Sequence, residues 1–242
     1  PPRTLITVAT YNEAENLPAL ADAVLRVVPT AHLLVIDDNS PDGTGRWCDE
    51  RAAQDPRVHC RHRDGKLGLG TAIMAGMQHA MEQDYDYVLN MDADFSHHPR
   101  YLPALIAGMD PPNGPAADVM IGSRYVAGGG TKDWPLKRKL MSRSVNIYAR
   151  WMLGLRAHDC SGAFRCYRVA LLRKVDFTAI RSRGYSFQEE ILWHLKRVGA
   201  RFGETPIVFA DREKGLSKIN SQEAAAALKV ILRLGIKNWI GV

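Results

Sequence analysis

Runs of β-forming, apolar residues alternate with segments of helical periodicity through the first half of the chain. The predicted strands cover residues 5–9, 33–36, 58–60 and 87–91, and the predicted helices cover residues 14–28, 44–54 and 71–82. This alternation is typical of a parallel sheet wrapped by helices. Ligands bind at the carboxyl ends of the strands in such sheets, so the residues after Ala9, Ile36 and Met91 are the first candidates for a functional site.

The second half of the chain follows a different pattern. A further strand is predicted at residues 119–121, and an irregular region opens at Gly128. Basic amphipathic helices are predicted at residues 136–155 and 224–240, because apolar side chains recur there at helical spacing between lysines and arginines.

Length and composition point to a single globular unit. The chain has 242 residues, of which 46% are apolar, and this is typical of one domain with a full core. We expect an α/β domain over residues 1–222, with a mainly parallel, Rossmann-like sheet flanked by helices. A C-terminal amphipathic helix is expected over residues 223–242. The net charge of +6 identifies no partner by itself.

Several classes of protein are disfavoured by what the sequence lacks. The cysteines Cys48, Cys60, Cys160 and Cys166 form no CxxC pair and show no zinc-type spacing, which favours reduced, buried thiols over a disulfide scaffold. No run approaches the roughly 20 apolar residues of a membrane-spanning helix, and the first residues lack a secretory signal. The loop at residues 65–70 matches neither the dinucleotide-binding nor the P-loop pattern.

Two carboxylates follow the strand at residues 87–91. Asp92 and Asp94 would point to the same side of an extended segment, where they could share one divalent cation with a diphosphate. Oxygen ligands suit Mg²⁺ or Mn²⁺. The alternative is an Asx-turn or a helix cap without metal. The adjacent His97 and His98 would point to opposite faces, so we expect them to be structural.

Polar residues also follow the first two predicted strands and converge on the same sheet edge. Asp38 could accept hydrogen bonds from a ribose or a base, as acidic residues do in nucleotide-binding folds. A turn-forming aspartate is the alternative. Tyr11 and Glu13 could stack on a base and hydrogen-bond to it, although Glu13 could equally cap the following helix.

Basic residues form a second set of candidates. Arg124 directly follows a predicted strand, Arg138 lies in the first amphipathic helix, and Arg212 and Lys218 lie in a short charged segment. Guanidinium groups bind phosphate oxygens through paired hydrogen bonds. The alternative for each arginine is a solvated or salt-bridged surface position.

Nine segments in order carry a resemblance to a known family. They lie between residues 5 and 218 and read TYNEAENL, VIDDNSPDGT, GLGTA, MDADFSHHP, GSRYVAGGG, WPLKRKLMSR, DCSGAFRCY, GYSFQEE and DREKGLSK. The chain resembles the inverting family 2 glycosyltransferases with the GT-A fold, and within them the dolichyl-phosphate (polyprenyl-phosphate) mannose synthases. The resemblance implies transfer of mannose from GDP-mannose to dolichyl or another polyprenyl phosphate, giving dolichyl β-D-mannosyl phosphate and GDP.

The resemblance also implies roles on the donor side. Tyr11, Glu13 and Asp38 would bind the guanosine of GDP-mannose, and Asp92 and Asp94 would hold Mg²⁺ or Mn²⁺ on its diphosphate. The further residues implied are the acceptor-phosphate ligands Arg124, Arg138 and Arg212, the donor ligands Arg212 and Lys218, and a catalytic set of Asp94, Arg124 and Arg138.

Two positions depart from the family pattern. Ala9 stands where the family commonly has proline, and Ser96 stands where many members carry a glutamine that helps to ligate the metal. Ser96 is therefore the candidate for a third ligand.

A lipid-linked acceptor implies a membrane surface as a partner. The chain resembles the peripherally attached members, so we expect it at the cytoplasmic face of a membrane, with the helix at residues 136–155 facing the bilayer and small membrane-anchoring subunits as further partners. The alternative is that both amphipathic helices pack on the domain with a solvated basic face.

The implied chemistry needs no general base. A phosphate monoester is already anionic near neutral pH, so it can attack the anomeric carbon directly, and one displacement inverts that centre. Two alternatives remain open: a transferase that uses another nucleotide sugar such as UDP-glucose, and a catalytically silent, membrane-recruited subunit that binds lipid phosphate. A nucleic-acid binder is disfavoured, because stacking aromatics do not alternate with the basic residues in any known module pattern.

Overall fold

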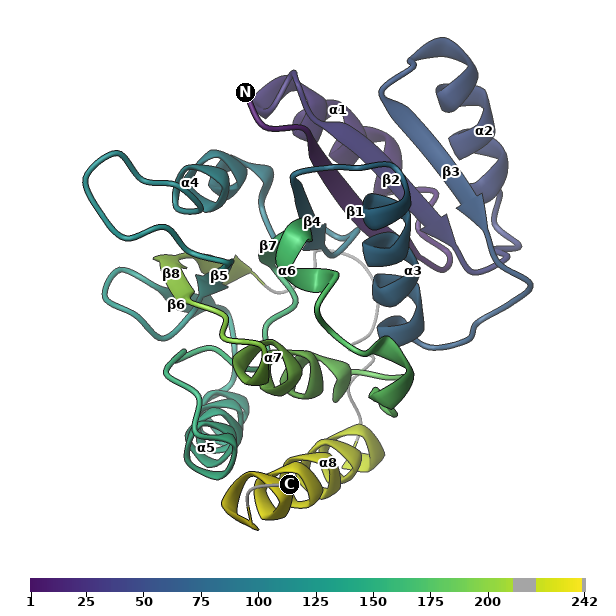
Figure 1. The fold of residues 1–242 in the computed structure, drawn as a ribbon. Coiled ribbons are helices and arrows are strands. Elements are labelled where there is room, and N and C mark those ends of the chain that lie inside the picture. The colour runs from purple at the N-terminus through teal and green to yellow at the C-terminus, as the bar shows by residue number, and fades with distance from the viewer. Residues whose placement is uncertain (211–220, 241–242) are drawn as a thin grey trace.

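The computed structural model describes residues 1–210 and 221–240, and its main feature is a sheet between two layers of helices (Figure 1). Seven strands form the sheet in the order β3-β2-β1-β4-β7-β5-β8, and β6 and β9 form a separate pair. The strands are β1 (Thr4–Thr10), β2 (His32–Asp37), β3 (Val58–His62), β4 (Tyr87–Met91), β5 (Val119–Ser123), β6 (Gly130–Lys132), β7 (Arg165–Arg168), β8 (Phe202–Pro206) and β9 (Val208–Ala210). The helices are α1 (Leu17–Val27), α2 (Thr44–Gln54), α3 (Leu69–Glu82), α4 (Leu102–Ala107), α5 (Leu136–Leu153), α6 (Val169–Leu172), α7 (Phe187–Arg197) and α8 (Ser221–Ile240), with short 3₁₀ turns at Pro99–Tyr101 and Phe177–Ala179.

One strand of the large sheet runs against its neighbours. The pairs of β1 with β2 and β4, of β2 with β3 and of β5 with β8 are all parallel, whereas β7 is antiparallel to both β4 and β5. Arg165, the first residue of β7, lies opposite Asn90 near the end of β4 and Ile121 in β5. The loop that enters β7 therefore lies at the edge where β4 and β5 end. The predicted α/β fold with a mainly parallel sheet is confirmed.

The hydrophobic core is divided between the two faces of the sheet. On one face, α1 buries Leu17, Leu20 and Val24 together with side chains of α2 and α4. On the other face, α3, α5, α6, α7 and α8 pack together, with Phe187 and Ile231 among the fully buried side chains. Each such side chain contributes roughly 1.5–3 kcal/mol by leaving water.

Several predicted helix boundaries differ from those observed by one to three residues, and two of the differences have a clear local cause. The first helix begins at Leu17 rather than at residue 14, because the Glu13 carbonyl accepts the N–H groups of Asn16 and Leu17 in a preceding turn. The fifth helix ends at Leu153, because Gly154 has a φ of 60° and turns the chain into the left-handed region. No described helix is long and apolar enough to cross a bilayer.

Candidate active site

The loops that follow β1 and β2 are tied together at the sheet edge. The Asn12 N–H donates to Ser40 Oγ at 3.0 Å, and the Ala14 N–H donates to Asp42 Oδ2 at 3.0 Å. Asn12 has a φ of 59°, a left-handed conformation that asparagine tolerates better than most residues, so the chain turns sharply out of β1. The carboxyl ends of these neighbouring strands therefore form one fixed edge.

Asp38 lies at this edge and is paired with an arginine. Its two carboxylate oxygens accept hydrogen bonds from Arg63 Nε at 2.6 Å and Nη2 at 2.9 Å, and both side chains are largely buried. Arg63 directly follows β3. The predicted third strand ends at residue 60 rather than at His62, so the sequence did not place Arg63 at a strand end. The pair fixes the direction of the Asp38 carboxylate, and a carboxylate has further acceptor capacity for a ligand.

Tyr11 and Glu13 lie in the loop after β1. Lys66 Nζ lies 4.7 Å from the centroid of the Tyr11 ring, a cation–π contact between this loop and the loop before α3. Glu13 Oε2 accepts a hydrogen bond from Asn16 Nδ2 at 3.0 Å, next to the start of α1. The three residues predicted to bind the guanosine, Tyr11, Glu13 and Asp38, thus share one edge of the sheet.

The predicted metal-binding carboxylates lie in a tight turn after β4. Ser96 donates to Asp94 Oδ1 from its backbone N–H at 3.1 Å and also from its hydroxyl, while Phe95 adopts a φ of 61°. These contacts form an Asx-turn, the alternative that the sequence left open. The extended conformation expected for this segment is wrong, because the Asp94 side chain competes successfully for the Ser96 backbone.

The turn leaves a donor set suited to a hard cation. Asp94 is buried, the Asp92 side chain is 31% exposed, and both offer carboxylate oxygens. An oxygen-rich pair of this kind fits Mg²⁺ or Mn²⁺, which complete their coordination with water and substrate phosphates. The Ser96 hydroxyl orients Asp94, and its role as a metal ligand stays a prediction.

Arg124 directly follows β5 and forms a buried ion pair with Asp159 in the loop before β7. Its Nε and Nη2 donate to the two carboxylate oxygens of Asp159, each at 2.7 Å, and Nη2 also donates to Ser161 Oγ at 2.8 Å. Burial by itself would raise the pKa of Asp159, but the charge and hydrogen bonds of Arg124 outweigh it and lower the pKa below its ordinary value. The antiparallel direction of β7 is what brings Asp159 to this edge.

Trp134 lies close to two of the predicted arginines, Arg124 and Arg138. The guanidinium carbon of Arg138 lies 3.9 Å from the centroid of the Trp134 ring, and that of Arg124 lies 5.6 Å from the same ring. Arg212 and Lys218, the other two predicted cationic residues, lie outside the described residues. Two of the four residues predicted to bind phosphate, Arg124 and Arg138, therefore lie close to the same aromatic ring.

His97 lies between the acidic turn and the arginine pair. Its Nδ1 accepts the backbone N–H of Asp92 at 3.1 Å. Burial lowers the pKa of His97, and the charges of Asp92, Asp94, Arg124 and Asp159 all act on its ring. The carboxylates and the arginine are thus within electrostatic reach of one buried side chain, and a structural role for His97 stays a prediction.

The family can be identified by comparison with known proteins. The family model described as "Glycosyl transferase family 2" matches residues 5–176. The chain belongs to glycosyl transferase family 2. The prediction that the chain is a glycosyltransferase is thereby confirmed.

Two curated relatives of this glycosyltransferase match it over nearly its whole length. A protein of Mycolicibacterium smegmatis named polyprenol monophosphomannose synthase is 42% identical over 236 residues, which cover 97% of this chain and 88% of the relative. A protein of Micrococcus luteus named undecaprenyl-phosphate mannosyltransferase is 43% identical over 241 residues, which cover 99% of this chain and 97% of the relative.

Solved structures support the fold. Glucosyl-3-phosphoglycerate synthase from Mycobacterium tuberculosis, in complex with Mn²⁺, uridine diphosphate and phosphoglyceric acid, superposes with a TM-score of 0.69. The match covers 97% of this chain and 78% of that chain at 16% sequence identity. At this identity the likeness shows the fold alone.

Three side chains of this glycosyltransferase escaped the sequence reasoning. Asp159 lies in a quoted motif but has no charge pattern around it, and Trp134 lies in an irregular loop. Glu189, in the first turn of α7, is buried, and its Oε2 has no hydrogen-bond partner among the described residues. Burial raises the pKa of Glu189 to about 7. The sequence around Glu189 gives no indication that this carboxylate is buried.

The raised pKa of Glu189 predicts a pH-dependent stability. A carboxyl group that is neutral in the folded state and ionised in the unfolded state stabilises the fold only at low pH. This contribution is complete below the ordinary pKa of 4.5 and is lost as the pH rises to about 7. Glu189→Gln should therefore be more stable to urea than the wild type at about pH 8, with a free energy of unfolding higher by about 2–3 kcal/mol, and should match the wild type at about pH 4.

Glu82→Gln provides the control for this measurement. Glu82 is an exposed carboxylate at the end of α3, so the same change there should leave the pH dependence of unfolding unaltered. An equal response of both variants would contradict the assignment to Glu189.

Proposed function

We propose that this glycosyltransferase transfers mannose from GDP-mannose to dolichyl or another polyprenyl phosphate, with inversion at the anomeric carbon. The observation that carries the proposal is the arrangement of charge at the sheet edge, where the carboxylates of Asp92 and Asp94 and the buried Arg124–Asp159 ion pair all lie within electrostatic reach of His97. Such an arrangement suits two anionic ligands, a metal-bound diphosphate and a phosphate monoester. The names of the two curated relatives support the sugar and the class of acceptor.

The described part of the proposed donor site lies before residue 98. Tyr11, Glu13 and Asp38 bind the guanosine in this proposal. Asp92 and Asp94 would hold Mg²⁺ or Mn²⁺, which when bound would neutralise charge on the departing diphosphate. Arg212 and Lys218 keep the roles predicted for them from the sequence.

The acceptor half relies on arginines that are oriented in advance. Asp159 holds Nε and Nη2 of Arg124, and within the described residues no hydrogen bond involves Nη1. This leaves the Nη1 hydrogens to donate to the acceptor phosphate, while Arg138 approaches from α5 over the Trp134 ring. A phosphate monoester carries its own negative charge, so these residues need only to hold it in line with the anomeric carbon.

A panel of nucleotide sugars tests the proposal. Purified protein is incubated with polyprenyl phosphate, Mn²⁺ and labelled GDP-mannose, UDP-glucose or UDP-galactose, and the lipid product is extracted. We expect label in the lipid from GDP-mannose. Label from UDP-glucose alone would overturn the choice of donor, and no transfer from any donor would favour a silent lipid-binding subunit.

Arg138→Ala is expected to separate the two ligands. Loss of a charge-assisted hydrogen bond should weaken the apparent affinity for a short, soluble polyprenyl phosphate by about 10- to 100-fold, with a smaller effect on GDP-mannose. Steady-state kinetics with each substrate varied measure the difference. Arg143→Ala, an exposed arginine on the same helix, is the control. Equal losses for both substrates would reassign Arg138 to the donor.

Exposed apolar side chains form one patch across α5 and α8, which contact each other on the side of the molecule away from α1 and α2 (Figure 1). The members of this apolar patch are Leu136, Leu140, Met141, Ile147 and Trp151 on α5, and Leu228, Leu232, Ile236, Trp239 and Ile240 on α8. The ring centroids of Trp151 and Trp239 lie 4.9 Å apart, so the exposed side chains of α5 and those of α8 are in contact at this point. Soluble monomers rarely expose a contiguous surface of this kind.

In this proposal the apolar patch rests on the cytoplasmic face of a membrane. Lys137, Arg143, Lys229 and Lys237 are exposed on the same two helices, and each basic residue near an anionic leaflet contributes about 1 kcal/mol. Tryptophan rings favour the boundary between headgroups and acyl chains. Peripheral attachment of this kind would bring the active site to an acceptor whose tail stays in the bilayer.

The double variant Trp151→Ser with Trp239→Ser tests the apolar patch. Loss of two large side chains from the bilayer interface should lower affinity for anionic vesicles by about 100-fold. Co-sedimentation with vesicles measures the binding. Val27→Ser, at an exposed apolar position on α1, is the control. Unchanged binding of the double variant would remove the patch from the proposal.

A further inference from the structure

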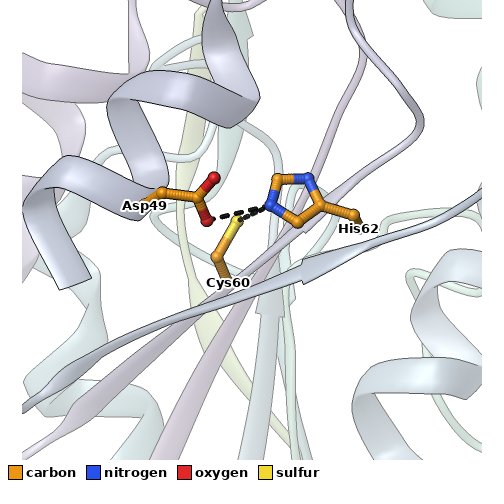
Figure 2. Close-up of side chains that lie close together, drawn as sticks. All are labelled: Asp49, Cys60 and His62. Carbon is orange, nitrogen blue, oxygen red and sulfur yellow. Dashed lines mark hydrogen bonds and ion pairs between the residues drawn. The ribbon is translucent and has the colours of Figure 1, made fainter. Parts of the chain in front are cut away.

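A mixed cluster of three side chains lies outside the active site, where α2 packs on the edge strand β3. Figure 2 shows Asp49 reaching from α2 toward Cys60 and His62, which share one face of β3 because they are two residues apart. His62 Nε2 lies 2.9 Å from Asp49 Oδ1 and 3.5 Å from Cys60 Sγ. The three potential ligand atoms all lie within 4.8 Å of one another, and within residues 1–210 and 221–240 this is the one group of its kind.

We propose that Asp49, Cys60 and His62 bind one Zn²⁺ ion, with water in the fourth position. Thiolate, imidazole and carboxylate are the three ligand types that zinc takes in proteins, at about 2.0–2.3 Å. Tetrahedral geometry with those bond lengths separates neighbouring ligand atoms by about 3.3–3.8 Å. The two separations from His62 Nε2, 2.9 Å to Asp49 and 3.5 Å to Cys60, are close to this range, and Asp49 and Cys60 lie within 4.8 Å of each other, so side-chain rotations can admit the ion.

The surroundings of His62 fit the role of a metal ligand. Its second ring nitrogen, Nδ1, lies 3.9 Å from Asp37 Oδ2, and ligating histidines are commonly oriented by a carboxylate on that side. Gly45 makes this approach possible, since a Cβ there would lie 2.9 Å from Asp37 Oδ2 and 3.0 Å from His62 Cε1. The ring is therefore held between α2 and the end of β2 with Nε2 directed at the other two ligands.

The ligand chemistry separates this zinc cluster from the carboxylates of the active site. Asp92 and Asp94 offer oxygen, which favours Mg²⁺ and Mn²⁺, whereas a thiol and an imidazole favour zinc. The spacing of the cysteines does not indicate such a site, because its ligands come from a helix and a strand. A bound ion would join α2 to β3 one residue before Arg63, the partner of Asp38.

Cobalt substitution tests the zinc cluster by a signal that needs a thiolate. Full-length protein is freed of metal by chelation and titrated with Co²⁺, and a sulfur-to-cobalt charge-transfer band is followed in the near ultraviolet. We expect one equivalent of Co²⁺ to produce the band, one equivalent of Zn²⁺ to remove it, and Cys60→Ser to abolish it. Asp94→Ala should retain the band, which distinguishes this cluster from the active-site carboxylates.

Further variants assign the remaining ligands. Asp49→Asn and His62→Gln should each weaken Zn²⁺ at least about tenfold in competition with a chromophoric chelator. Asp22→Asn, at an exposed aspartate on α1, should bind Zn²⁺ as the wild type does. Circular dichroism confirms that each variant is folded. Absence of the cobalt band in the wild type, or its persistence in folded Cys60→Ser, would overturn the proposal, as would Zn²⁺ affinity unaffected by Asp49→Asn and His62→Gln.

Discussion

Replacing Asp94 by alanine is expected to reduce turnover at least about 10³-fold while the protein stays folded. In the proposed function this carboxylate helps to hold the cation that offsets charge on the departing diphosphate, and loss of such electrostatic stabilisation has effects of this size. The contacts of Asp94 with Ser96 are local to one turn, so their loss should cost only about 1 kcal/mol of stability. Transfer of label to lipid measures the first effect, and thermal unfolding measures the second.

A second substitution separates the charge of Asp94 from its place in the turn. Asp94→Asn keeps an oxygen that accepts from Ser96 but removes the negative charge. We expect it to be nearly as inactive as the alanine variant and to need far more Mn²⁺ for GDP binding. A near-normal rate for Asp94→Asn would show that the turn matters and the metal does not.

Asp159→Asn is expected to have the largest effect on stability. It would leave the Arg124 guanidinium buried beside a neutral amide, and breaking a buried ion pair costs about 3–5 kcal/mol. For a chain of this size that lowers the unfolding temperature by about 10 °C. Because the pKa of Asp159 is lowered in the fold, its stabilisation is complete at neutral pH and is lost only as the pH falls below the ordinary value of 3.8.

An exposed ion pair provides the matched control for Asp159. Asp84 and Arg173 are 2.6 Å apart, but their side chains are 84% and 47% exposed, so Asp84→Asn should change stability by less than about 1 kcal/mol. Acceptor affinity should fall in Asp159→Asn as well, because Arg124 loses the partner that orients it. Equal unfolding temperatures for the two variants would show that the Arg124 pair contributes no more than a surface contact.

The first half of the fold was predictable because its pattern is local. Every strand and helix from β1 to β4 was expected within a few residues, since buried runs and amphipathic repeats are each visible in a short window. The strand β7 was missed because its four residues include Arg165, which is fully buried and donates to two backbone carbonyls. The helix α7 was not predicted, because the carboxylates Glu189 and Glu190 lie among its buried residues and interrupt the apolar pattern.

The positions of the candidate site residues were predictable from the sequence, but their ion-pair partners were not. Rules for strand ends and motifs located Asp38 and Arg124, because these depend on order along the chain. Their partners, Arg63 and Asp159, depend on which strands become neighbours, and no sequence window contains both members of either pair. The reversal of β7 is the feature that the sequence pattern could least reveal.

That reversed strand also separates two parts of the proposed site along the chain. Among the described residues, those proposed for the nucleotide all precede β5, whereas Arg124, Arg138 and Asp159 follow one another in the later part of the chain, with β7 hydrogen-bonded between β4 and β5. Insertions or exchanges in the loop that enters β7 would leave the register of β1 to β4 untouched. In the proposed function, changes in this loop would therefore alter the acceptor side of the site without moving the strands that position the nucleotide.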